Sequence, residues 1–133
     1  MEQKIYSAAE AKSNPAMIDM IYIYNDAEAL FVSPSSGTAP QAYSDIQTWA
    51  VKNETLFQAT SVTPSEFDKI TGDPEIFLAY DGASGFAKEI SKPLTNNSVI
   101  GFKTKNDKKG LIKITNITTG VNGSITFDVK VQK

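Results

Sequence analysis

The sequence predicts a single α+β domain, with helices and strands mixed in residues 1–85 and an antiparallel β part in residues 86–133. Three observations lead to this prediction. Helix-capping signals alternate with short apolar runs in the first part. In the second part, apolar and polar residues alternate with the period of a β-strand. No linker separates the two parts, and a length of 133 residues suits one domain with one core.

The front part is expected to begin with a short strand at residues 4–6, a short helix and a hairpin. Ser7, followed three residues later by Glu10, forms a capping box that starts the helix. The apolar run 17–24 predicts a buried strand, and the run 28–33 predicts a second one. A turn between the two runs is expected to pair them as a hairpin.

A loop and a second helix follow. Residues 33–43 are dense in Ser, Pro and Gly and lack periodicity, which predicts an exposed surface loop. Ser44 is expected to cap a helix that ends near Asn53. Ile46 and Trp49 share one face of that helix, so Trp49 is expected in the core rather than on a ligand-binding surface.

The front part ends with a strand and two further elements. Residues 55–62 predict the strand. Thr63, followed three residues later by Glu66, forms a second capping box that predicts a helix. Pro64 suits the first position of that helix. Residues 74–80 fit a helix and a strand almost equally well, so both alternatives stay open.

The back part predicts a three-stranded antiparallel meander with one apolar face and one solvated face. Its strands are 99–105, 112–115 and 125–132. The first tight loop, "NDKKG", ends in Gly110, which suits a left-handed backbone conformation. The second connection contains Asn122-Gly123, a strong hairpin signal.

Composition excludes several kinds of chemistry. The sequence has no Cys, no His and no Arg. It therefore lacks a thiolate nucleophile, an imidazole base and the usual ligands of zinc or iron. "DGASG" and "NDKKG" lack the ligand spacing of a calcium loop. We expect no catalytic residues, metal or cofactor, and the net charge of −2 gives no reason to expect nucleic acid as a partner.

Lysines form one candidate binding surface. Lys103, Lys105, Lys113 and Lys130 fall at alternate positions of the predicted meander and would share a face. Such a stripe would suit a polyanion, for example a sulfated glycan. A solvated sheet face explains the same pattern, because Asp107 and Asp128 interrupt the stripe and no Arg assists it. The lysines would then also discourage edge-to-edge pairing of sheets.

Aromatic and acidic side chains supply the other candidates. Tyr43, Tyr80 and Phe86 lie beside predicted loops, where exposed rings would stack on sugar rings. Asp19 interrupts an apolar run, and its pKa would be raised by burial unless hydrogen bonds compensate. A carboxylate-dependent glycosidase would need a second acid within about 5 to 10 Å of the first.

The C-terminal stretch "SVIGFKTKNDKKGLIKITNITTGVNGSITFDVKVQK" resembles the ending "VIAFKT…GKYGLIKV…G.I.IDVKVQK" of a family of secreted or surface-anchored proteins of Bacteroidota. "YSAAEAKSNPAMIDMIYIYND", "QTWAVKNETLF" and "TPSEFDKI" resemble segments of the same proteins, in the same order. Lys109 departs from the pattern, which often has an aromatic residue there. The resemblance implies an exported lipoprotein module of unassigned function, at the cell surface or in the periplasm.

Two functions are carried forward. The first is a non-catalytic module of an exported protein that serves attachment, scaffolding or ligand binding, with a glycan or another surface protein as partner. Contact with the membrane would then be made only through a lipid anchor upstream of this chain. The alternative is a carboxylate-dependent glycan hydrolase or an accessory subunit of one.

Overall fold

The computed structural model describes residues 3–83, 85–120 and 122–133. Its helical elements, with η for a 3₁₀-helix, are α1 (Ala8–Ser13), η1 (Pro15–Met17), α2 (Ala39–Ala42), η2 (Ser44–Thr48), α3 (Pro64–Lys69) and α4 (Asp73–Asp81). Its strands are β1 (Ile21–Tyr24), β2 (Ala29–Val32), β3 (Thr55–Ala59), β4 (Val99–Thr104), β5 (Lys109–Thr118) and β6 (Ser124–Val131). Within these residues, no helix has the length and apolarity needed to cross a membrane.

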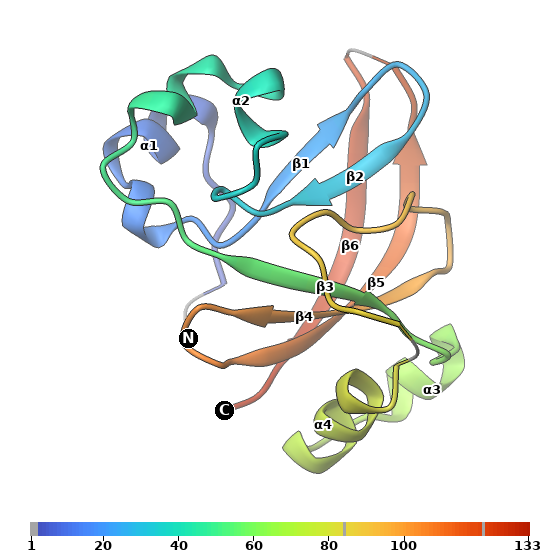
Figure 1. Cartoon of the computed structure of the whole chain (residues 1–133). Coiled ribbons are helices and arrows are strands. Elements are labelled where there is room, and N and C mark those ends of the chain that lie inside the picture. The colour runs from blue at the N-terminus through green and yellow to red at the C-terminus, as the bar shows by residue number, and fades with distance from the viewer. Residues whose placement is uncertain (1–2, 84, 121) are drawn as a thin grey trace.

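The strands form two antiparallel sheets, β1-β2 and β3-β4-β5-β6 (Figure 1). The α+β class and the β1-β2 hairpin are confirmed. The predicted three-stranded meander is incomplete, because β3 joins it as a fourth strand beside β4. Phe57 of β3 lies opposite Phe102 of β4, and the apolar face that the two strands share gives this distant pairing its stability.

An irregular segment, residues 88–94, connects the two sheets. Ile90 bridges to Val32 of β2, and Lys88 bridges to Phe57 of β3. The Ser91 N–H also donates to the carbonyl oxygen of Phe31 at 2.9 Å. The backbone ladder therefore continues from β1 to β6 through this segment. Among the described residues, β1 and β6 each pair with a strand on one side only and form the edges of this ladder.

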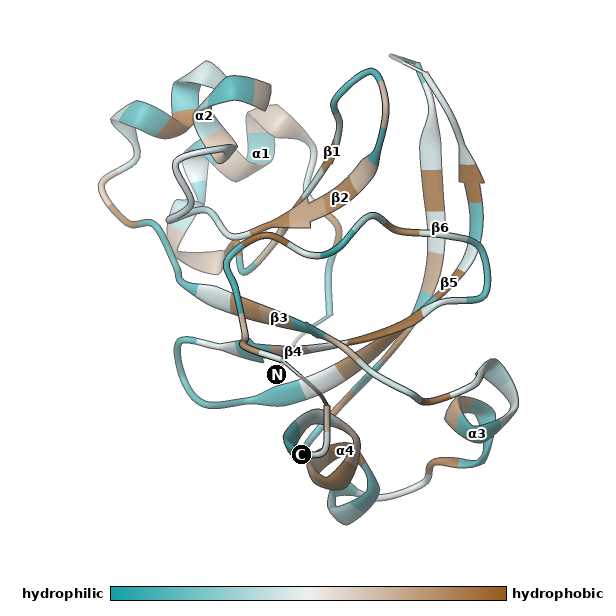
Figure 2. Cartoon of the chain, turned by 45° about the vertical axis from the view of Figure 1, so that its right-hand side comes forward, coloured by the Kyte–Doolittle hydropathy of each residue, from teal (hydrophilic) through white to brown (hydrophobic). Residues whose placement is uncertain are grey.

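Each face of the four-stranded sheet is covered by a different layer (Figures 1 and 2). The β1-β2 hairpin packs on one face, around a core of buried apolar residues: Ala29, Phe31, Phe57, Leu94, Ile100, Phe102, Ile112 and Ile114. Helices α3 and α4 cover the other face through Phe67 and Ile76, which contact Val99 and Leu111. The prediction of a solvated second face is therefore wrong where these helices lie.

Local signals in the front part are largely confirmed. Both capping boxes form, Ser7 with Glu10 and Thr63 with Glu66. Residues 74–80 are helical, since α4 begins with Pro74 in its first turn and buries Ile76 and Tyr80 on one face. Residues 4–6 form no strand, and the strand predicted at 17–24 begins only at Ile21, because η1 occupies Pro15–Met17.

The loop predicted at residues 33–43 is not an exposed surface loop. Ser33 is 0% exposed, and α2 forms within the segment. The Ser33 hydroxyl accepts the Thr55 N–H at 2.9 Å and donates to the Asn53 carbonyl oxygen at 2.9 Å. Because side-chain hydroxyls satisfy backbone groups, a polar segment can be buried here.

Two further local predictions are wrong. Ser44 makes no capping hydrogen bond, and the element it begins is a short 3₁₀-helix rather than an α-helix. Gly110 is not the left-handed residue of its loop; Asp107 is, with φ of 59°. Gly110 lies in β5, where an added Cβ would overlap the Phe102 ring. The glycine is therefore needed for close packing rather than for turning the chain.

A candidate binding groove

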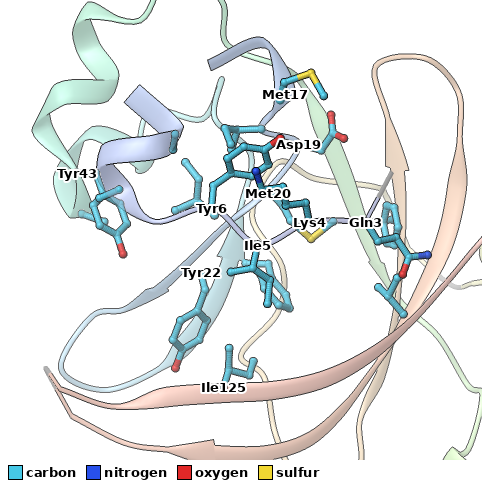
Figure 3. A pocket seen from close by; sticks show the side chains of 18 of the residues that line it. Gln3, Lys4, Ile5, Tyr6, Met17, Asp19, Met20, Tyr22, Tyr43 and Ile125 are labelled. Atoms are coloured by element: carbon cyan, nitrogen blue, oxygen red, sulfur yellow. The ribbon is translucent and has the colours of Figure 1, made fainter. Parts of the chain in front are cut away.

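A groove of about 1290 Å³ opens between the β1-β2 hairpin, β6 and the N-terminal residues 3–6 (Figure 3). Its floor includes Phe31 and Phe102, and its rim includes Tyr43. The volume exceeds the range of roughly 300 to 1,000 Å³ that is typical of sites for small molecules. The size of the groove suits a long ligand.

Strand β6 forms one wall. Four apolar side chains at alternate positions point toward the groove and are only partly buried: Ile125, Phe127, Val129 and Val131. The neighbouring strand β5 buries Ile112 and Ile114 completely. The Phe127 ring meets the Phe31 ring edge to face at 5.4 Å and closes the floor of the groove. Apolar surface at the edge of the sheet thus stays partly uncovered.

Three residues that line the groove carry a buried polar atom with no hydrogen-bond partner. These atoms are the Tyr22 hydroxyl, the Trp49 indole nitrogen and the Thr104 hydroxyl. Thr104 is 3% exposed. A buried polar group without a partner costs about 1 to 3 kcal/mol. A ligand with hydrogen-bonding groups would remove part of this cost.

Two titratable groups of the groove have shifted pKa values. Burial raises the pKa of Tyr22, and the neighbouring Tyr24 and Tyr43 raise it further. Burial also raises the pKa of Asp19, although the hydrogen bond from the Asn53 amide at 3.2 Å and the charge of Lys105 act in the opposite direction. Asp19 is half-buried and hydrogen-bonded, and its pKa is raised nonetheless, because the effect of burial outweighs that of the hydrogen bond.

The other acids beside the groove are engaged elsewhere. Asp45 pairs with Lys12 at 3.4 Å, and Asp128 pairs with Lys113 at 3.3 Å. Among the described residues, no group of three or more acidic side chains is placed to hold a metal ion. Asp19 makes no ion pair within the described residues, and its side chain is held instead by the Asn53 amide.

Three of the four candidate lysines lie on the side of the sheet that faces α3 and α4: Lys103, Lys113 and Lys130. Lys113 donates to Asp68 at 2.6 Å, and Lys103 pairs with Asp107 at 3.7 Å. The Lys130 amine donates to backbone carbonyls at the end of α3. Lys105 is exposed beyond the end of β4. The structure thus brings three of the four lysines to one face and gives each of these three an internal partner.

The candidate aromatics do not form one surface. Tyr43 lines the groove and is 43% exposed. Tyr80, in α4, is 4% exposed, and its ring packs against Gly101 of β4. The prediction that Tyr80 is exposed is therefore wrong. Phe86 is 91% exposed and does not line the groove. Trp49, which was expected in the core, packs against a buried cluster but is only partly buried and lines the groove. Tyr22 and Thr104 were not among the candidates, since their polar atoms stand out only once the fold buries them.

No protein-family model matches the chain, and no curated protein matches it. A solved structure with a similar fold is that of a DUF4466 family protein from Parabacteroides merdae ATCC 43184, with a TM-score of 0.63 and 17% sequence identity. The match covers 98% of this chain and 45% of that chain. The similarity shows a shared fold, in a protein of the Bacteroidota.

Proposed function

We propose that this chain is a non-catalytic binding module and that the groove between β1 and β6 is its ligand site. The observation that carries the proposal is an apolar groove of about 1290 Å³, lined by three residues that each carry a buried polar atom without a partner. Apolar walls with a few polar groups are the usual composition of a binding site. The absence of His, Cys and Arg from the sequence supports a role other than catalysis.

The proposal places the module in an exported protein of Bacteroidota, at the cell surface or in the periplasm. Its support is the resemblance of the C-terminal stretch to such proteins and the Parabacteroides structure of similar fold. Fractionation of the native organism with an antibody against the chain tests the location. Recovery with the cytoplasmic fraction would contradict it.

A neutral apolar dye, Nile red, tests the groove as a ligand site. The dye should bind with saturable fluorescence, and Ile125→Asp should weaken the binding by roughly tenfold, because a carboxylate at the mouth of the groove opposes an apolar ligand. Ser124→Asp is the matched control, since Ser124 is exposed and does not line the groove. Equal affinities of the two variants would contradict the assignment of the site.

A glycan hydrolase remains the second candidate, and the raised pKa of Asp19 beside the groove favours it. The test is release of reducing sugar from a panel of purified bacterial and host glycans. The enzyme would be favoured over the binding module if the wild type hydrolyses a glycan and Asp19→Asn does not, while both proteins bind Nile red. No hydrolysis across the panel would exclude those glycans as substrates and leave the binding module.

A further inference from the structure

We infer that the ligand of the groove is an extended peptide strand that pairs with the free edge of β6 and directs alternate apolar side chains into the groove. The inference rests on the proposed function, because it names the ligand of the same site. It follows from the backbone geometry of β6, from the absence of the usual edge protection and from the positions of the unpaired polar atoms.

Backbone hydrogen bonds show which residues of β6 point outward. The Ile114 N–H and carbonyl oxygen bond toward β4, to Ser98 and Asn97, and the Gln132 N–H donates to Lys109 of β5 at 3.0 Å. Backbone groups alternate in direction along an antiparallel strand. The even residues of β6 therefore pair with β5. The odd ones turn their N–H and carbonyl groups to the free edge: Phe127, Val129 and Val131.

The residues with free backbone groups are also those whose side chains line the groove. Side chains and backbone groups both alternate along a strand, so the odd positions of β6 present a row of apolar side chains with a row of donors and acceptors beside it. A peptide strand matches both rows, since its own groups alternate in the same way.

Strand β6 lacks the features that usually protect an edge. It contains no Pro, and its two charged side chains act on the other face of the sheet. Asp128 pairs with Lys113, and Lys130 bonds to α3. The irregularity in the β5-β6 register lies between Ile114 and Asn116, in β5. Long edges without protection pair readily with another strand.

The N-terminal residues 3–6 do not fill this place. They cross the mouth of the groove (Figure 3), but no hydrogen bond of the described residues joins them to β6. Ile5 is 83% exposed rather than seated in the groove. Among residues 3–83, 85–120 and 122–133, none forms a backbone hydrogen bond to the outer edge of β6.

The unpaired polar atoms favour a peptide over a single-chain lipid. Figure 3 shows Tyr22 above Ile125, while the register across β5 places Thr104 at the Val131 end of β6. Six residues of strand span roughly 20 Å, so unpaired groups lie toward both ends of the groove. A lipid chain carries its hydrogen-bonding groups at one end. A peptide carries carbonyl and N–H groups along its whole length.

The probes are three acetylated and amidated octapeptides, with the sequences KVTVTVTK, KLTLTLTK and KFTFTFTK. Calorimetric titration of the intact chain identifies the tightest of them. Two N-methylated forms of that peptide are then compared, one methylated at the odd positions and one at the even positions. One of the two methylated peptides should bind roughly tenfold more weakly than the other, because only the N–H groups at one set of alternate positions face β6. Equal affinities of the two methylated peptides would contradict the inference that the ligand pairs with β6 as a strand.

Variants of Val129 test the same pairing from the protein side. Val129→Pro removes the outward N–H, which the β5 ladder does not use, whereas Val129→Ala shortens the side chain and keeps the N–H. The proline variant should bind the peptide roughly tenfold more weakly than the alanine variant. Far-ultraviolet circular dichroism and a cooperative thermal unfolding transition show that each variant is folded, since neither measurement depends on the groove. Equal peptide affinities of two folded variants would overturn the inference.

The two proposals fail in different ways. Suppose that Nile red binds saturably and that no peptide binds up to about 1 mM, the limit of weak recognition. The inference of a peptide strand would then be wrong, and the proposal that the groove is a ligand site would stand. Absence of both would overturn both proposals.

Discussion

The side-chain amine of Lys130 lies 2.6 Å from the carbonyl oxygen of Phe67 and 4.8 Å from the centre of the Phe67 ring. The same amine donates to the carbonyl oxygen of Ile70 at 2.7 Å. Carbonyls at the end of a helix lack partners within the helix, and a positive charge is favourable there. One lysine of β6 thus fastens α3 to the sheet.

Lys130→Met keeps most of the aliphatic side chain and removes the amine. We expect the free energy of unfolding to fall by about 1 to 3 kcal/mol, because buried carbonyl groups lose a charged donor. Urea denaturation measures the change. Lys69→Met, on the exposed last turn of α3, is the matched control and should change stability by less than about 0.5 kcal/mol. Equal losses in the two variants would disprove the role of Lys130.

Asp19 should make stability depend on pH. Its pKa is raised by burial, so the folded chain holds the proton to a higher pH than the unfolded chain does. The stability that this group contributes is complete below the unfolded pKa of about 3.9 and is lost as pH rises through the folded value. Asp19→Asn should therefore gain stability relative to the wild type as pH rises toward neutrality.

Urea denaturation between about pH 3.5 and pH 7 measures this difference. Glu28→Gln, at an exposed position of the β1-β2 turn, is the control and should show no such trend. An advantage of Asp19→Asn that is the same at every pH would show that its cause is not the ionisation of Asp19.

Gly110→Ala should be strongly destabilising. The added methyl group would overlap the Phe102 ring, which is itself buried in the core. Overpacking of this kind costs about 1 to 3 kcal/mol. Gly37→Ala serves as control, because no atom lies within 4 Å of its added methyl group. Thermal unfolding of the two variants decides the point, and a Gly110→Ala protein as stable as the control would refute it.

Ser33→Ala tests the buried loop that precedes α2. Removal of the hydroxyl takes away the acceptor of the Thr55 N–H and a donor to the Asn53 carbonyl oxygen. We expect a loss of about 1 to 3 kcal/mol in chemical denaturation, since each group is left buried. Ser124→Ala, at an exposed end of β6, should be nearly neutral. If Ser33→Ala were as stable as Ser124→Ala, the segment before α2 would behave as an exposed loop and the prediction would be wrong.

Local features were predictable because their partners are close in sequence. Both capping boxes join residues three apart, and the β1-β2 hairpin closes over a short turn. The pairing of β3 with β4 and the bridging by residues 88–94 were not predictable, since these contacts join distant segments. Residues 88–94 fall in the part that was expected to be antiparallel β, but an alternating pattern does not show which distant strands, here β2 and β3, the segment contacts.

The groove shows the same division. Its apolar wall was visible as alternation along residues 125–131, but alternation is the same in a central strand and in an edge strand. Only the strand order places β6 at an edge. Likewise, Lys113 and Lys130 are correctly assigned to one face, yet only the packing of α3 brings Asp68 to Lys113 and the helix-end carbonyl groups to Lys130.

The sequence by itself determined the α+β class, the capped helices and the chemistry that is missing, because composition and short-range spacing need no partner elsewhere in the chain. The tertiary structure alone decided which strand has a free edge, which lysines are engaged and which hydroxyl groups are buried without partners. These properties arise when distant segments exclude water from one another. The groove belongs to this second group, and the peptide and dye titrations test the proposal that it is a ligand site.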